Sequence, residues 1–181
     1  MSQNNARTVT AAVNSVGILD IKSLVLLAIL LAAGFILNLT LGNALAIVGI
    51  KPQFIIAAYA LAILLIDANY LQAIIFAVIS ACVIQLTTSI PGLNFATETV
   101  AALAMVALVK SGIGGKNLNP LVATFVATLI SGALFAVLGT VIMGGAIAST
   151  AVKIPLVLGT AVFNAILVQA LSIPLKKVFS K

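Results

Sequence analysis

Among the charged residues that lie beside or within long apolar stretches of the chain, Lys51, Glu98 and Lys153 are the candidates for chemistry. A charge in such a place is costly enough to require a partner or a function. The lone carboxylate of Glu98 favours a cation, either a lysine of the chain or the amine of a ligand; alternatively it bonds a loop from the first turn of its helix. Lys51 and Lys153 could pair with a ligand carboxylate, or extend to lipid headgroups.

Uncharged polar residues accompany these charges. A hydroxyl-rich turn shortly before Glu98 fits either a ligand site or an ordinary polar loop. Asn164 follows Pro155 by nine residues, a depth of about 14 Å along a helix. Its amide either joins two helices or caps the floor of a ligand cavity. The candidate substrate-binding residues are Lys51, Gln53, Thr87, Thr88, Ser89, Asn94, Glu98, Lys153 and Asn164.

The composition disfavours enzyme chemistry. The chain has no histidine, one cysteine (Cys82) and no pair of acids close in sequence, so it lacks the usual general bases and metal-binding clusters. The glycine-rich stretch 112–117 lacks the first glycine and the hydroxyl of a phosphate-binding loop. We therefore expect no enzyme activity, no ATP hydrolysis, no metal and no cofactor.

The elements that must position these residues are apolar helices. Of 181 residues, 63% are hydrophobic and 7% are charged, whereas soluble proteins carry roughly 25% charged residues. This predicts an all-α integral membrane protein. The net charge of +6 comes without an aromatic-rich basic patch, so no nucleic acid is expected as a partner. The six predicted membrane segments are 23–41, 52–66, 70–86, 95–109, 120–143 and 154–175.

Segment length separates two groups of helices. A spanning helix needs roughly 20 residues, which segments 23–41, 120–143 and 154–175 provide. Segments 52–66 and 95–109 offer only about 15 residues, or about 22 Å. Short helices are tolerated where protein or a water-filled cavity surrounds their ends. The shortfall therefore indicates a site near Lys51 and Glu98. Prolines at 52, 120 and 155 are expected to mark helix starts.

Charge distribution predicts the orientation. Six spans put both termini on one side, which would carry seven of the nine Lys and Arg residues, whereas Lys51 and Lys153 lie on the other. This bias predicts cytoplasmic termini and an outward-facing charged site. Residues 22–181 are expected to form a single six-helix membrane domain, and residues 1–21 either a polar tail or a short interfacial helix.

Small and polar residues within the segments predict helix contacts. Ala28 and Ala32, with the neighbouring Ala33 and Gly34, would let another helix approach segment 23–41 closely. Asn38 and Thr40, near the end of this segment, are expected to bond the local helix backbone. Gln169 is expected to bridge two helices.

Several strings resemble the bacterial tryptophan transporter family, over about residues 22–178. They are Lys51-Pro52, Leu86-Thr87-Thr88-Ser89-Ile90-Pro91-Gly92 leading to Glu98, Ile130-Ser131-Gly132, Val162-Phe163-Asn164 and Ser172-Ile173-Pro174. That family is regarded as a substrate-binding (S) component of energy-coupling-factor (ECF) transporters. The resemblance implies an S-component-like bundle, multi-pass in the bacterial cell membrane, that binds tryptophan near the extracellular face. It also implies docking through Ala28 and Ala32 on a transmembrane scaffold that carries two ATPase subunits.

The charges fit such a ligand. A zwitterionic amino acid needs an anion, a cation and an apolar cavity, and Glu98, Lys51 and the aliphatic segments offer that set. An indole N–H would find an acceptor in Asn164 or in the Thr87 and Thr88 hydroxyls. Three alternatives remain open: an S component for a vitamin, a stand-alone proton-coupled or facilitative carrier, and a structural membrane subunit without a ligand.

Overall fold

The computed structural model describes residues 20–47 and 52–179, which form helices and short turns without any strand. α1 continues through a π-helical turn, η1, into the short α2, and the 3-10 helix η2 precedes α7. The elements are α1 (Ile21–Leu37), η1 (Asn38–Gly42), α2 (Asn43–Ala46), α3 (Phe54–Ile66), α4 (Tyr70–Ile84), α5 (Leu93–Ser111), α6 (Gly115–Ile142), η2 (Ile147–Lys153) and α7 (Ile154–Phe179).

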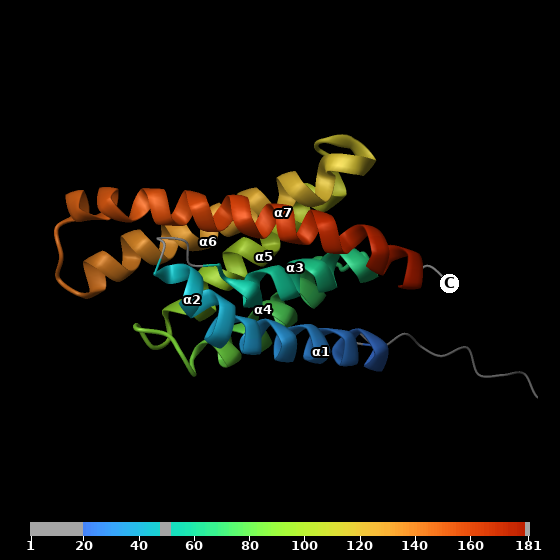
Figure 1. The fold of residues 1–181 in the computed structure, drawn as a ribbon, viewed down its shortest axis with the longest axis horizontal. Coiled ribbons are helices and arrows are strands. Elements are labelled where there is room, and N and C mark those ends of the chain that lie inside the picture. Colours follow the sequence, from blue (N-terminus) through green and yellow to red (C-terminus); the bar gives the residue numbers. More distant parts are fainter. Residues whose placement is uncertain (1–19, 48–51, 180–181) are drawn as a thin grey trace, which may run out of the picture.

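The centre of the bundle is α3, which the neighbouring helices surround (Figure 1). Every residue from Phe54 to Leu64 is buried. A helix that is apolar on all sides is stable only when all sides are covered. The 13 residues of α3 rise about 20 Å, so the expectation of a short helix at 52–66 is confirmed. Contact with protein on all its sides makes this length acceptable.

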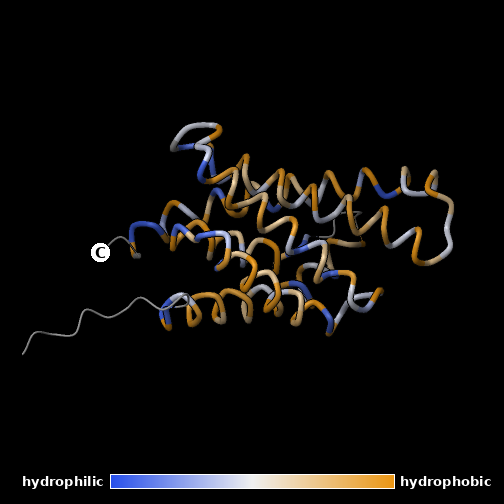
Figure 2. The backbone as a smooth tube through the Cα atoms, turned by 180° about the vertical axis from the view of Figure 1, so that it is seen from behind, coloured by the Kyte–Doolittle hydropathy of each residue, from blue (hydrophilic) through white to orange (hydrophobic). Residues whose placement is uncertain are grey.

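Four stretches are long and apolar enough to cross a membrane: Ile21–Ala46, Leu93–Ser111, Asn117–Ile142 and Ile147–Val178. Apolar residues run along the helices, and hydrophilic residues gather mainly near the helix ends (Figure 2). This is the architecture of a helical membrane protein. The expectation that segment 95–109 would be too short is wrong, because α5 has 19 residues. The two short apolar helices are instead α3 and α4.

The start of α6 also differs from the sequence expectation. Pro120 lies inside α6, which begins at Gly115. The backbone N–H of Leu121 donates to Gln169 Oε1 (3.0 Å), and Gln169 Nε2 donates to the carbonyl of Asn117 (2.8 Å). One side-chain amide of α7 thus pairs with two backbone groups that flank the proline, which compensates for local disruption of the helix. The expected interhelical role of Gln169 is confirmed.

Helix α1 packs closely on the first turn of α3. A Cβ atom at Gly34 would lie 2.9 Å from the carbonyl oxygen of Phe54, so the glycine permits this approach. The backbone N–H of Phe54 donates to Asn38 Oδ1 (3.0 Å). The expectation of local bonding is wrong for Asn38, which satisfies a free N–H at the start of α3. It is confirmed for Thr40, whose hydroxyl donates to the carbonyl of Ile36 (2.8 Å).

The helix connections alternate between the two ends of the bundle. The start of α1, the end of α7, and the α3–α4 and α5–α6 turns lie at one end (Figure 1). At the opposite end lie α2, the α4–α5 turn and the α6–α7 connection that contains η2. The predicted polar cluster falls at this second end.

Candidate functional site

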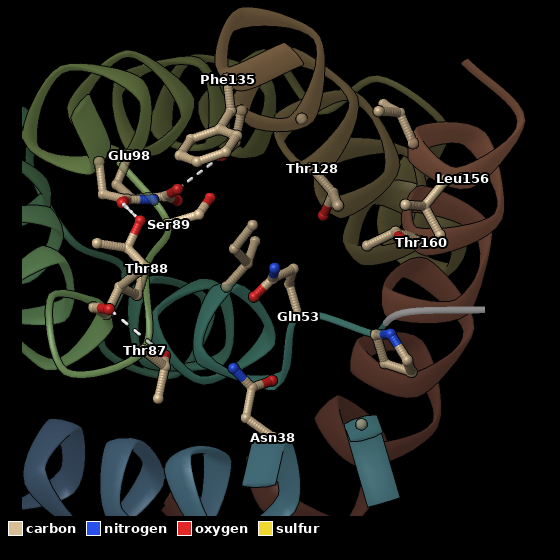
Figure 3. A pocket seen from close by; sticks show the side chains of 18 of the residues that line it. Asn38, Gln53, Thr87, Thr88, Ser89, Glu98, Thr128, Phe135, Leu156 and Thr160 are labelled. Carbon is tan, nitrogen blue, oxygen red and sulfur yellow. Dashed lines mark hydrogen bonds between the residues drawn. The ribbon is translucent and has the colours of Figure 1, made fainter. Parts of the chain in front are cut away.

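A cavity of about 660 Å³ lies among η1, η2 and the helices α2 to α7. Its volume is within the range of small-molecule sites, roughly 300 to 1,000 Å³. The labelled side chains in Figure 3 surround this space from several elements. Apolar parts of the wall come from Ile56, Ile84, Phe135, Leu156 and Val157. The polar parts come from Asn38, Asn43, Gln53, Thr87, Thr88, Ser89, Asn94, Glu98, Thr128, Ser131, Lys153 and Thr160.

Glu98 is the acidic group of the cavity. It lies in the second turn of α5 and is 2% exposed. Its Oε2 accepts a hydrogen bond from the Tyr59 hydroxyl of α3 (2.9 Å), and its Oε1 accepts from Ser131 of α6 (2.7 Å). Thr97 donates to Oε1 as well (3.3 Å). A carboxylate removed from water needs such donors, and here three helices supply them.

Glu98 makes no ion pair with any residue in the described ranges, although a lysine shares its cavity. The Nζ atom of Lys153, at the end of η2, donates to the Thr140 hydroxyl (2.8 Å). Lys153 and Glu98 therefore line one space without touching. The other predicted cation, Lys51, lies outside the described residues. The cavity thus combines a negative and a positive group with an open volume between them.

The hydroxyl-rich turn contributes one wall. Thr87, Thr88 and Ser89 line the cavity, together with Asn94 from the first turn of α5. The Thr88 hydroxyl donates to Asn94 Oδ1 (2.7 Å), which joins the turn to the helix that carries Glu98. The structure therefore brings these predicted residues together in one site.

The two remaining predicted residues have different positions. Gln53 precedes α3 and lines the cavity. Asn164 is fully buried in α7, is not among the lining residues, and donates from Nδ2 to the carbonyl of Gln53 (3.1 Å). This contact joins α7 to the start of α3, which is the first of the two roles expected for Asn164.

Several residues of the site were not predicted as substrate-binding, among them Tyr59, Thr128, Ser131 and Phe135. A signal did exist for two of them, because Thr124, Thr128 and Ser131 recur at helical spacing within an apolar segment and so share one face. Tyr59 carries no comparable signal, since its partner Glu98 is 39 residues away in the sequence.

No protein-family model, curated protein or solved structure matches this chain. The fold and the cavity define the class: a helical membrane protein with a charged and apolar internal site.

Proposed function

We propose that this chain is a solute-binding membrane protein that holds a small zwitterion between Glu98 and Lys153. One observation carries the proposal: a negative and a positive side chain line the same cavity, with apolar walls between them. An ammonium group would find the carboxylate of Glu98, and a carboxylate group would find the Lys153 ammonium. Charge-assisted bonds of this kind are strong in a site shielded from water.

Tryptophan is the solute we propose. An indole ring requires an apolar surface and an acceptor for its N–H. Phe135, Leu156 and Ile56 supply apolar surface, and hydroxyls such as those of Thr87 and Thr88 supply acceptors. The family strings described above support the same solute.

The proposed topology has six membrane segments and cytoplasmic termini in a bacterial cell membrane. Lys110, Lys176 and Lys177 occur at the helix ends that share the side of the α1 start, and Lys22 lies in the first turn of α1. Lys153 lies at the opposite end, beside the cavity. Since loops rich in lysine stay in the cytoplasm, this distribution favours a cavity that faces outward.

The proposed role in transport is that of the substrate-binding subunit of an ECF-type importer. The sequence has no phosphate-binding loop, so the energy would come from two partner ATPases on a transmembrane scaffold. The outer face of α1 offers a contact surface, because Ala28 and Ala32 are exposed beside the exposed Val25 and Ile29. Small residues on such a face allow another helix to approach closely.

Ligand fluorescence tests the proposal. The chain contains no tryptophan, so the emission of added tryptophan can be followed with the purified protein in detergent. We expect saturable binding. Failure to bind tryptophan, together with binding of a vitamin from a panel, would contradict the proposed solute. Uptake by liposomes that contain this chain alone would contradict its role as a subunit of an ATP-driven importer.

A further inference from the structure

We propose that Glu98 and Thr128 form a subsite specific for a primary ammonium group, and that Tyr59 is the positioning residue of this subsite. The inference rests on the proposed solute-binding role of the cavity, but not on tryptophan as the solute. It identifies the chemical group at one end of the ligand and the residues that distinguish this group from other cations.

The carboxylate of Glu98 has hydrogen-bond donors but no cation. The Ser131 and Thr97 hydroxyls donate to Oε1, the Tyr59 hydroxyl donates to Oε2, and the Asn94 side chain also hydrogen-bonds the carboxylate. Glu98 makes no ion pair within the described part of the chain, so a cation beside the carboxylate would supply the missing charge.

Thr128 provides a second acceptor. It is 1% exposed, lines the cavity, and its Oγ1 has no hydrogen-bond partner among the described residues. A buried hydroxyl without a partner costs free energy unless a ligand or a water satisfies it. Thr128 precedes Ser131 by one helical turn on the same face of α6, so it neighbours the hydroxyl that contacts Glu98. Figure 3 shows Thr128 and Glu98 on the wall of the same space.

Asn94 holds the carboxylate from within α5. It lies one turn before Glu98, lines the cavity, and its Oδ1 accepts from Thr88. Its amide group also hydrogen-bonds the Glu98 carboxylate, so Asn94 is a donor to Glu98. A primary ammonium has three N–H donors, of which the Glu98 carboxylate and the Thr128 hydroxyl would accept two. Each methyl group added to the nitrogen removes one of these donors.

Tyr59 acts on this subsite through Glu98. Its side chain is fully buried in α3, and its hydroxyl donates to Oε2. The Tyr59→Phe variant would remove this donor and leave the carboxylate freer to turn. Tyr70 is the matched control, because it is the other tyrosine of the chain and is 49% exposed on α4.

Binding of tryptamine and of its N,N,N-trimethyl derivative tests the subsite. Both are cations with the same ring, but only tryptamine has N–H donors on its charged group. We expect the wild-type protein to bind tryptamine about 10 to 100 times more tightly, as the loss of hydrogen bonds to a charged group implies. The preference should fall to about threefold or less in Thr128→Val and in Tyr59→Phe, since each weakens the acceptor set.

Three controls separate this role from general damage to the fold. Thr128→Ser keeps the hydroxyl and should keep the preference. Thr124→Val removes a hydroxyl that is also buried and without a partner, but that lies one turn away and does not line the cavity; it should keep the preference too, as should Tyr70→Phe. Because the readout is a ratio of two affinities in one protein preparation, partial loss of folded protein does not change it.

The outcomes distinguish the two proposals. Absence of a preference in the wild-type protein, including failure to bind either amine, would overturn the ammonium subsite. So would an equal loss of preference in Thr124→Val and Thr128→Val. If tryptamine binds with the expected preference but tryptophan does not bind, the subsite stands and the proposed solute is wrong. If tryptophan binds but the preference is absent, the solute stands and the subsite is wrong.

Discussion

At the scale of single residues, the proposed function depends on the charge of Glu98. The side chain is buried with three hydroxyl donors and, within the described residues, without a cation. Neutral donors lower the free energy of a buried carboxylate but leave its charge unbalanced. The site is therefore already ordered around a negative group before any ligand arrives, which reduces the entropy lost on binding.

Replacement of Glu98 by Gln tests this charge. The substitution keeps the size of the side chain and removes the negative group, so we expect the Kd for tryptophan to rise by about 10- to 100-fold. Lys153→Met is the matched change on the opposite wall. It should weaken tryptophan binding but leave tryptamine, which has no carboxylate, bound as before. Fluorescence titration measures these affinities, and an unchanged Kd for tryptophan in Glu98→Gln would contradict the proposed role of the charge.

Residue types alone located part of the site. Glu98 and the 87–89 turn stand out because they are polar within an apolar sequence. The contact between Tyr59 and Glu98 could not be predicted, because it joins two helices through residues 39 positions apart. The predicted contact of Glu98 with a lysine is not made by Lys153, which donates to Thr140 instead.

At the scale of the elements, the cavity depends on the position of α3. The Asn38 side chain accepts a hydrogen bond from the first turn of α3. This turn packs against α1 at Gly34, where the backbones of the two helices come close. Gln53, which lines the cavity, immediately precedes this turn. A shift of α1 would therefore be transmitted to the site through the start of α3.

Gly34→Ala tests this packing. The new Cβ atom would lie 2.9 Å from the Phe54 carbonyl oxygen, a distance that forces the helices apart. We expect a loss of about 1 to 3 kcal/mol in the free energy of unfolding. Gly159→Ala on α7 is the control, because a Cβ atom there meets nothing within 4 Å and alanine favours the helix by about 1 kcal/mol. Thermal unfolding in detergent compares the two; equal melting temperatures would contradict close α1–α3 packing.

Apolar runs in the sequence located α1 and the helices α3 to α7, but not all of their ends. The start of α5 was missed because Asn94 is polar and faces the cavity rather than lipid. The start of α6 was missed because its first turns are polar. Asn119 there donates to the carbonyls of Leu108 and Ile113, and these tertiary contacts have no counterpart in an apolar pattern. Both helix starts were therefore missed because their polar residues face the cavity or other parts of the protein.

At the scale of the whole molecule, the cavity and most of the lysines occupy opposite ends of the bundle. Composition predicted this division, since an apolar chain with few charges must place them at the ends of its spans. The shape of the cavity could not be predicted, because it arises where eight elements and the turn at 87–89 meet. In the proposed topology, a solute reaches the site from outside the cell.

Accessibility of single cysteines in intact cells tests this claim most directly. In a Cys82→Ser background, which removes the native cysteine, Ser89→Cys would place a thiol on the cavity wall. Ser149→Cys would place one on the exposed surface of η2, away from the cavity lining. We predict that a membrane-impermeant maleimide labels both variants without permeabilisation, and that tryptophan slows the labelling only at position 89. Labelling of position 89 only after permeabilisation, or at a rate that tryptophan does not change, would contradict an outward-facing solute site.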